Sequence, residues 1–132
     1  MANSLQIIKF VGTVSTGQGH GKFFVEMPWV MQQLKEITGG THYPGTLNIR
    51  LTTEYINQRI RLTRQNGVIV RPANGYSPGY LYNAKIFNIK CFAVLPDVPN
   101  YPKDLLEIIA TEKLRSLLNV KDGDKITLSV LL

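Results

Sequence analysis

Residues 43–51 read Tyr43-Pro44-Gly45-Thr46-Leu47-Asn48-Ile49-Arg50-Leu51, and the rest of the chain is organised around this stretch. Pro44 and Gly45 predict a tight turn, because proline restricts φ and glycine adopts backbone angles that other residues avoid. Apolar and polar residues then alternate, so positions 47, 49 and 51 share one face and positions 46, 48 and 50 share the other. This pattern is typical of a half-buried β-strand.

Thr46 and Asn48 place a hydroxyl and a side-chain carbonyl on the same side of this strand, beside the turn. Neutral oxygens of this kind can bind a hard cation such as Mg²⁺, which keeps water and phosphate oxygens as its other ligands. The same spacing is also typical of a strand face that only contacts solvent. Both interpretations stay open on the spacing alone.

The composition favours one compact domain over residues 1–132, since a chain of this length can bury a core without disulfides or structural metal. The single cysteine, Cys91, lies in an apolar run, which predicts a small core residue rather than a nucleophile. It cannot form a disulfide within the chain, which favours a reducing, cytoplasmic location. No stretch approaches the roughly 18 consecutive apolar residues of a membrane span, and the N-terminus lacks the apolar segment of a signal peptide. We therefore expect a soluble protein.

The basic residues are unevenly distributed along the chain. Fifteen Lys and Arg residues against nine Asp and Glu residues give a net charge of +6, and no acidic residue occurs between Glu54 and Asp97. A positive segment attracts polyanions, either nucleic acid or the triphosphate of a nucleotide. A basic face that only contacts solvent is the third interpretation.

A glycine-rich segment, Gly17-Gln18-Gly19-His20-Gly21-Lys22, follows the strand-like residues 5–14. Alternate glycines let backbone N–H groups turn toward an anion, and Lys22 adds a positive charge, so this segment could bind phosphate. It lacks the G-K-[S/T] ending of a Walker loop, and it does not match a Rossmann fingerprint. A flexible hairpin loop is the alternative interpretation.

Periodicity predicts two main helices. The first covers roughly Trp29 to Ile37, with Pro28 in its first turn and Gly39-Gly40 at its end. The second begins at Pro102, and its buried stripe consists of Leu105, Ile108, Ile109, Leu114, Leu117 and Leu118. On its other face Glu107, Thr111 and Arg115 would form a polar ridge at i, i+4 and i+8. A short helical turn is expected from Thr52 through Asn57.

Strand-like composition occurs in the segments 5–14, 23–25, 46–51, 60–71, 81–95 and 125–131. Residues 72–80 form a turn-rich loop between two of them. Many short strands with few helices indicate a small β-barrel to which the helices are attached.

Five motifs occur together in the order and approximate spacing of one protein family. They are Gly17–Lys22, Pro44–Asn48, Leu106–Ala110, Lys113–Arg115 and Asp122–Asp124. In these motifs the chain resembles the archaeal CTP-dependent riboflavin kinases along nearly its whole length. The resemblance implies a mainly β fold, a six-stranded cradle-loop β-barrel with two or three attached helices. It also implies transfer of the γ-phosphoryl group of CTP to the 5′-hydroxyl of riboflavin, which gives FMN and CDP.

The same resemblance implies roles for individual residues. Nucleotide binding falls to Gly17, Gln18, Gly19, His20, Gly21 and Lys22 and to Glu112, Lys113, Leu114 and Arg115. Thr46 and Asn48 would bind Mg²⁺, and Glu107, Asn100 and Tyr101 would contact the flavin. As a hypothesis, Glu107 orients or deprotonates the attacking hydroxyl and Lys22 neutralises phosphate charge, which makes these two the catalytic residues.

Two alternatives remain open. A related barrel could bind nucleic acid through its basic middle segment, although the basic residues are scattered along strands rather than clustered on a recognition helix. A relative that binds nucleotide or flavin without turnover is the second alternative, because Asp97–Tyr101 replaces a threonine-containing flavin contact of the family. We expect a monomer that acts on CTP and riboflavin and has neither nucleic acid nor a membrane as a partner.

Overall fold

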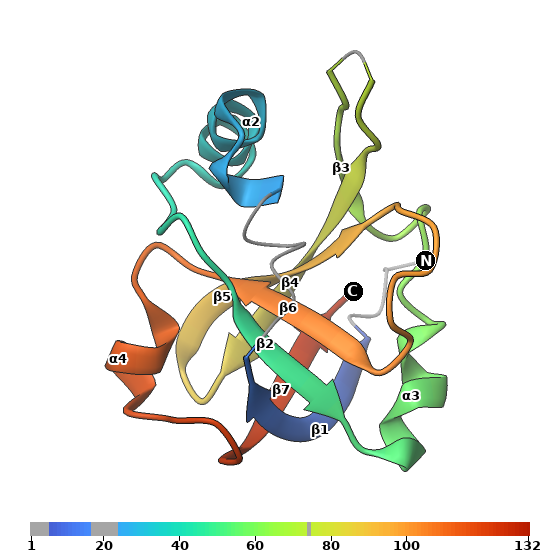
Figure 1. Cartoon of the computed structure of the whole chain (residues 1–132), viewed down its shortest axis with the longest axis vertical. Coiled ribbons are helices and arrows are strands. Elements are labelled where there is room, and N and C mark those ends of the chain that lie inside the picture. The colour runs from blue at the N-terminus through green and yellow to red at the C-terminus, as the bar shows by residue number, and fades with distance from the viewer. Residues whose placement is uncertain (1–5, 17–23, 74) are drawn as a thin grey trace, which may run out of the picture.

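A computed structural model describes residues 6–16, 24–73 and 75–132 of the chain. Its strands are β1 (Ile7–Ser15), β2 (Leu47–Leu51), β3 (Val68–Val70), β4 (Gly79–Ile86), β5 (Ile89–Pro96), β6 (Leu105–Ile109) and β7 (Lys125–Leu131). Its helices are α2 (Pro28–Thr38), α3 (Thr53–Arg59) and α4 (Leu114–Leu118), and residues 24–26 are also helical. Figure 1 shows the strands curving around a common interior, with the helices outside them.

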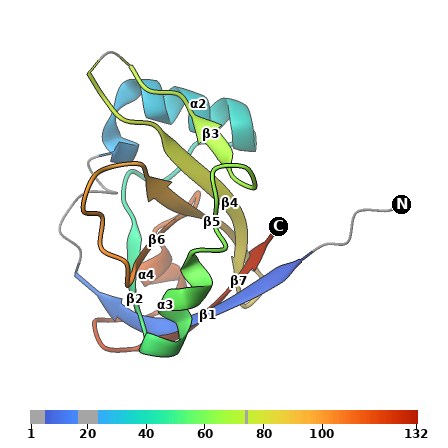
Figure 2. The same ribbon diagram turned by 90° about the vertical axis from the view of Figure 1, so that its right-hand side faces the viewer.

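The strands close into a barrel in which all neighbours are antiparallel. The sheet order is β3-β4-β5-β6-β2-β1-β7, and β4 also pairs with β7. Residues 79–81 of β4 pair with β3, whereas residues 84–85 pair with β7, so one edge of β4 serves two partners. Six strands therefore form the closed barrel, and β3 is an extra strand that pairs with the first residues of β4 (Figure 1 and Figure 2). This arrangement confirms the predicted mainly β, six-stranded barrel with attached helices.

Because side chains alternate between the two faces of each strand, the buried apolar residues form one cluster inside the barrel and a second cluster outside it. Ile49 of β2 and Ile108 of β6 belong to the cluster that fills the barrel. On the outer face, Leu34 of α2 packs in a second cluster with Val94 of β5 and Ile109 of β6. Burying an aliphatic side chain of this size contributes about 2 kcal/mol to stability. The helix α2 is thereby held against the outside of β5 and β6.

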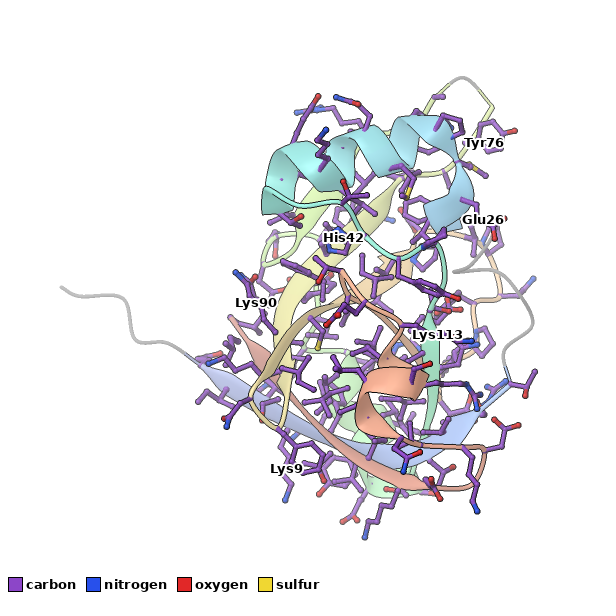
Figure 3. All side chains as sticks on the ribbon, turned by 90° about the vertical axis from the view of Figure 1, so that its left-hand side faces the viewer. Lys9, Glu26, His42, Tyr76, Lys90 and Lys113 are labelled. Atoms are coloured by element: carbon purple, nitrogen blue, oxygen red, sulfur yellow. The ribbon has the colours of Figure 1, made fainter. Side chains whose placement is uncertain are left out.

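The helix α2 begins and ends as predicted. Pro28 occupies its first turn, where a missing N–H costs no hydrogen bond, and Gly39 follows the last turn with a φ of 80°. The next segment carries His42 between α2 and the barrel (Figure 3), with its ring centroid 5.7 Å from that of Phe92. His42 Nδ1 lies 3.3 Å from the carbonyl oxygen of Gly40. Burial lowers the pKa of His42 from its ordinary value of 6.5.

The prediction of one long helix from Pro102 to Leu118 is wrong. Residues 105–109 form β6, all five of them buried, and only Leu114–Leu118 are helical. The inner face of β6 packs in the barrel, and Ile109 on the other face packs under α2. A strand buried on both faces gives the same short apolar run as a buried helix, so periodicity could not separate the two. Glu107, Thr111 and Arg115 consequently do not form a ridge on one helix.

Three other segments differ from their predictions. Phe24 and Val25 are helical rather than extended, and both pack in the outer cluster. Within 60–71 only Val68–Val70 is a strand, because Thr63 and Asn66 exchange side-chain to backbone hydrogen bonds that hold a turn. The segment 81–95 is a hairpin of two strands that reverses at Phe87, where φ is 53°.

Cys91 is fully buried in the inner cluster, and burial raises its pKa to about 12. This agrees with the predicted role of Cys91 as a core residue rather than a nucleophile. In the part of the chain that the structure describes, no helix has both the length and the apolar character needed to cross a membrane.

Candidate active site

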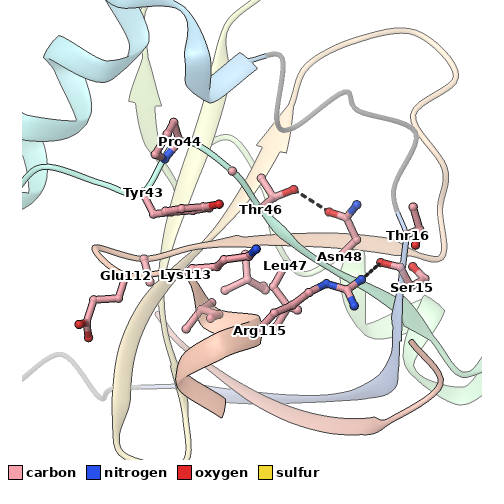
Figure 4. A pocket seen from close by; sticks show the side chains of 14 residues that line it. Ser15, Thr16, Tyr43, Pro44, Thr46, Leu47, Asn48, Glu112, Lys113 and Arg115 are labelled. Atoms are coloured by element: carbon pink, nitrogen blue, oxygen red, sulfur yellow. Dashed lines mark hydrogen bonds between the residues drawn. The ribbon is translucent and has the colours of Figure 1, made fainter. Parts of the chain in front are cut away.

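A cavity of about 320 Å³ brings together three separate segments of the sequence (Figure 4). It is lined by Ser15, Thr16, Tyr43, Pro44, Gly45, Thr46, Leu47, Asn48, Ile108, Ala110, Glu112, Lys113, Leu114 and Arg115. These residues come from the end of β1, from the turn into β2 with the start of that strand, and from the end of β6 through the start of α4. The predicted metal pair and the predicted 112–115 segment therefore share one cavity.

The turn at 43–46 has the shape that its proline and glycine predict. The N–H of Gly45 donates to the carbonyl oxygen of Tyr43 at 2.9 Å. A Cβ on Gly45 would lie 2.8 Å from the ring of Tyr43, so any other residue here would have to displace that ring. The turn thus places Tyr43 over the entry to β2, and Thr46 and Asn48 follow it on the cavity wall.

Thr46 and Asn48 form a pair of neutral oxygen donors. The Thr46 hydroxyl donates to Asn48 Oδ1 at 2.7 Å (Figure 4), and Asn48 is buried. Adjacent ligands of an octahedral Mg²⁺ ion lie about 2.9 Å apart, given metal–oxygen distances near 2.05 Å. The spacing and chemistry of this pair therefore fit two neighbouring positions around magnesium. Among the described residues no cluster of three or more His, Cys, Asp or Glu side chains could hold a metal instead.

Glu107 lies in β6 directly opposite Asn48 of β2 in the antiparallel ladder. The Glu107 side chain is fully buried, and it lies on the same face of the sheet as the side chain of Asn48. Glu107 Oε2 accepts a hydrogen bond of 2.6 Å from the hydroxyl of Tyr101. Burial and the charge of Glu107 raise the pKa of Tyr101, so the hydroxyl keeps its proton and donates. The sequence predicted a helix at this position, whereas Glu107 lies on a strand, opposite Asn48.

Tyr101 is held from its other side by Arg59 of α3. The guanidinium of Arg59 lies 5.2 Å from the centroid of the Tyr101 ring. Arg59 Nη1 also donates to the carbonyl oxygens of Pro102 and of Leu105, the latter at 2.8 Å. The helix α3 therefore fixes the segment that carries Tyr101 toward Glu107. Asn100 and Tyr101 line a second cavity of about 430 Å³, which Glu107 does not line.

Lys113 and Arg115 bring two positive charges to the wall of the first cavity, and Glu112 brings one negative charge. Arg115 Nη2 donates to the backbone oxygen of Ser15 at 3.1 Å and to Asp122 Oδ1 at 2.5 Å. These contacts hold the guanidinium between the end of β1 and the turn before β7, and Figure 4 shows the bond to Ser15. A cationic group fixed in this way can bind a phosphate oxygen.

The predicted glycine loop, Gly17 to Lys22 with His20 inside it, lies outside the described residues. Its position in the sequence is nevertheless informative, since Thr16 lines the cavity and immediately precedes Gly17. In the predicted basic middle segment, two side chains have partners within the fold, since Arg59 contacts Tyr101 and Arg64 pairs with Asp97 at 2.9 Å.

Sequence reasoning missed several residues of the site. Ser15, Thr16 and Tyr43 line the cavity; Thr16 and Tyr43 each immediately precede a motif that was recognised, and Ser15 precedes Thr16. The Oγ of Ser15 is buried, and no described residue is its hydrogen-bond partner. Adjacency to the motifs was the available signal for these three residues. The contact between Asp122 and Arg115 spans two elements and had no signal in the sequence.

Comparison with known families gives a match over most of the chain. The family model CTP-dep_RFKase, described as "Domain of unknown function DUF120", matches residues 14–130. The matched region includes every residue that was predicted to belong to the site.

Curated relatives that carry the name riboflavin kinase are similar over nearly all of this chain. The protein of Pyrobaculum aerophilum is 36% identical over 129 residues, which make up 95% of this chain and 61% of that protein. The protein of Methanosarcina acetivorans is 34% identical over 128 residues, or 94% of this chain and 54% of that protein. The protein of Archaeoglobus fulgidus is 33% identical over 129 residues, and the match covers 95% of this chain and 55% of that protein. The chain thus spans between 54% and 61% of the length of these relatives.

Proposed function

The chain belongs to the CTP-dependent riboflavin kinase family, and from this premise we propose that it transfers the γ-phosphoryl group of CTP to riboflavin. The oxygen of the riboflavin 5′-hydroxyl forms a bond to the γ-phosphorus, and the bond between that phosphorus and the CDP oxygen breaks. The hydroxyl proton leaves to a carboxylate, and the products are FMN and CDP. The observation that carries this proposal is the cavity that joins Thr46, Asn48 and Arg115, with Glu107 opposite Asn48.

The nucleotide occupies this cavity. Phosphoryl transfer needs positioning and neutralisation of charge more than covalent chemistry. Lys113 and Arg115 supply positive charge from the cavity wall, and Arg115 is held by its contacts to Ser15 and Asp122. Gly17 to Lys22 would continue from Thr16 along the phosphates, with backbone N–H groups and the Lys22 ammonium as donors.

Thr46 and Asn48 would hold Mg²⁺ through Oγ1 and Oδ1, and the ion when bound neutralises negative charge on the phosphates. Both ligands are uncharged, so they bind the metal weakly in the absence of nucleotide. The nucleotide and the metal therefore enter the site together. Removal of the Thr46 hydroxyl should consequently raise the Mg²⁺ concentration that the reaction needs, while the fold stays intact.

Glu107 serves as the acceptor for the proton of the 5′-hydroxyl. It is the acidic residue directly opposite the metal pair, and its burial strengthens its electrostatic interactions. Tyr101, predicted as a flavin contact, donates its hydroxyl to Glu107, which supports a role in holding the carboxylate. Asn100 stays a predicted flavin contact, since it neighbours Tyr101 in the second cavity.

Three further predictions belong to this proposal. Residues 1–132 act as one domain, the protein is a monomer, and it works in the cytoplasm on CTP and riboflavin. Two basic side chains of the middle segment have partners within the fold, since Arg59 donates to the carbonyl oxygen of Leu105 and Arg64 pairs with Asp97. This supports a kinase over a nucleic-acid-binding barrel. Gel filtration tests the monomer directly.

Formation of FMN from riboflavin tests the proposed function. Purified protein is supplied with riboflavin and MgCl₂ and, in separate reactions, with CTP, ATP, GTP or UTP, and the flavins are separated by chromatography. FMN with CTP and little FMN with the other nucleotides supports the proposal. FMN with ATP would retain the reaction but reject the donor. Absence of FMN in every reaction with folded protein would reject the activity.

A further inference from the structure

We propose that Asp122 is a positioning residue of the nucleotide cavity, which acts by holding Arg115 and Thr16 in place. This inference rests on the proposed function of the cavity and adds to it a residue that does not line the cavity. It also gives a role to the motif Asp122-Gly123-Asp124, which the sequence singled out without a function.

One carboxylate joins two walls of the cavity. Asp122 Oδ1 accepts a hydrogen bond from Arg115 Nη2 at 2.5 Å, and Asp122 Oδ2 accepts one from the Thr16 hydroxyl at 2.6 Å. Arg115 belongs to α4, whereas Thr16 follows β1 and directly precedes Gly17. Asp122 therefore links Thr16, the residue before the glycine segment, to Arg115 on the cationic wall.

The backbone of the turn fixes the position of this carboxylate. The N–H of Gly123 donates to the carbonyl oxygen of Val14, and the N–H of Val14 donates to the carbonyl oxygen of Asp124, both at 2.8 Å. Gly123 has a φ of 90°, a conformation that other residues rarely adopt. Asp124 Oδ2 accepts from the N–H of Lys121 at 2.9 Å and closes the turn. The turn is thus tied to β1 two residues before Thr16.

Asp122 leaves part of the Arg115 guanidinium available for a phosphate. Arg115 uses Nη2 for both of its hydrogen bonds, to Asp122 and to the backbone oxygen of Ser15. Within the described ranges no further acceptor is bonded to Arg115, so Nη1 and Nε remain as donors. Two acceptors from different parts of the chain, both bonded to Nη2, restrict the orientation of the guanidinium. The carboxylate thereby pre-orients the donors that face the nucleotide.

The negative charge of Asp122 also repels a bound phosphate. Orientation of Arg115 favours nucleotide binding, whereas this repulsion opposes it. The Asp122 side chain is 54% exposed, so solvent and salt screen its repulsion of a phosphate. Its two hydrogen bonds are direct contacts at 2.5 and 2.6 Å, and solvent and salt weaken them less than they weaken the repulsion over the longer distance to a phosphate. Orientation therefore outweighs repulsion, and loss of the carboxylate weakens nucleotide binding.

The test compares Asp122→Asn with the matched control Asp124→Asn. This control removes the same charge at a residue that does not contact Arg115 or Thr16, and its asparagine keeps an oxygen that can accept from the N–H of Lys121, so the turn is preserved. CTP binding is measured by calorimetry in the presence of Mg²⁺ without riboflavin, and KM values for CTP and riboflavin are measured separately. We expect Asp122→Asn to weaken CTP binding about tenfold, the size of loss that misplacement of a binding group causes. The KM for riboflavin and the Tm should match those of Asp124→Asn.

A second comparison shows whether Asp122 acts through Arg115. Arg115→Met alone should weaken CTP binding, and addition of Asp122→Asn to Arg115→Met should have less than about a twofold further effect, since coupled residues are not additive. Unchanged or tighter CTP binding by Asp122→Asn, or full additivity of the two substitutions, would overturn the inference. A wild-type protein that binds CTP but forms no FMN would reject the kinase activity and still allow this test. A wild-type protein that does not bind CTP would overturn both.

Discussion

Asn48 of β2 and Glu107 of β6 are direct partners in the antiparallel ladder of the barrel. Side chains of such partners start about 5 Å apart on the same face of the sheet. The proposed metal ligand and the proposed proton acceptor are therefore positioned by two hydrogen-bonded strands rather than by loops. This rigidity suits a reaction that depends mainly on placement of its groups.

The role of Glu107 predicts a specific kinetic defect. Glu107→Gln keeps the size of the side chain and an oxygen that can accept from Tyr101, but it cannot accept the proton of the riboflavin hydroxyl. We expect kcat to fall about 100-fold, as is common when an acid–base group is removed, while CTP affinity stays within about twofold of wild type. Steady-state FMN formation and calorimetry measure the two quantities. Wild-type turnover by Glu107→Gln would contradict the role of this carboxylate.

The role of Thr46 predicts a change in the magnesium requirement. Thr46→Val removes the hydroxyl and preserves the shape, so the Mg²⁺ concentration that gives half-maximal FMN formation should rise about tenfold, as for other losses at metal sites. The matched control is Thr127→Val, which makes the same change at an exposed position of β7. Equal magnesium dependence of the two variants would show that Thr46 does not bind the metal.

Tyr101 should influence turnover through Glu107. Tyr101→Phe removes the hydrogen bond to Glu107 and should lower kcat about fivefold to tenfold through loss of orientation, with the KM for CTP unchanged. Tyr82→Phe is the control, because the Tyr82 hydroxyl donates to the backbone oxygen of Thr63 at 2.7 Å and does not contact Glu107. Turnover and Tm are measured for both variants. A loss of Tm without a loss of kcat in Tyr101→Phe would limit this residue to a structural role.

His42 should make stability depend on pH. Its pKa is lowered in the folded protein, so the unfolded chain binds a proton more readily as the pH falls. The contribution of His42 to stability is therefore constant above its ordinary pKa of 6.5. It decreases as the pH falls from 6.5 through the lower pKa of the folded protein. Urea denaturation between pH 5 and pH 7.5 measures this decrease, and His42→Gln should reduce it. An identical pH profile for the variant would assign the effect to other groups.

Gly12 tests the packing of the barrel itself. A Cβ at this position would lie 2.3 Å from the backbone oxygen of Arg50, which belongs to the paired strand β2 and cannot move alone. We expect Gly12→Ala to destabilise the fold by about 2 to 3 kcal/mol, as overpacking does. Gly40→Ala is the control, since its Cβ would meet only Thr111 Cγ2 at 3.5 Å. Equal urea midpoints for the two variants would contradict the packing at Gly12.

Local signals predicted those elements whose ends are marked in the sequence. Pro28 and Gly39 delimit α2, and the alternation after Gly45 gives β2 with its apolar residues inside. The last strand, Lys125–Leu131, was predicted with its observed bounds, since a glycine turn precedes it. In each case the turn or cap and the periodicity indicate the same structure.

The error at Leu105–Ile109 has a physical cause. Burial of this segment comes from α2 on one side and the barrel on the other, which are contacts between distant parts of the chain. Such contacts leave no periodic polar residues to reveal a strand. Glu107 was therefore chosen for the site through the family resemblance, while its position opposite Asn48 and its bond to Tyr101 required the fold. The carboxylate bridge of Asp122 was hidden for the same reason.

Transfer of label from CTP tests the central claim most directly. Stoichiometric protein, riboflavin, Mg²⁺ and CTP labelled with ³²P at the γ position are mixed for a single turnover, and the products are separated by chromatography. The account predicts label in FMN with CDP unlabelled, and a strongly slowed transfer in Glu107→Gln. Label released only as inorganic phosphate, or label that remains in CTP with folded protein and bound nucleotide, would contradict it.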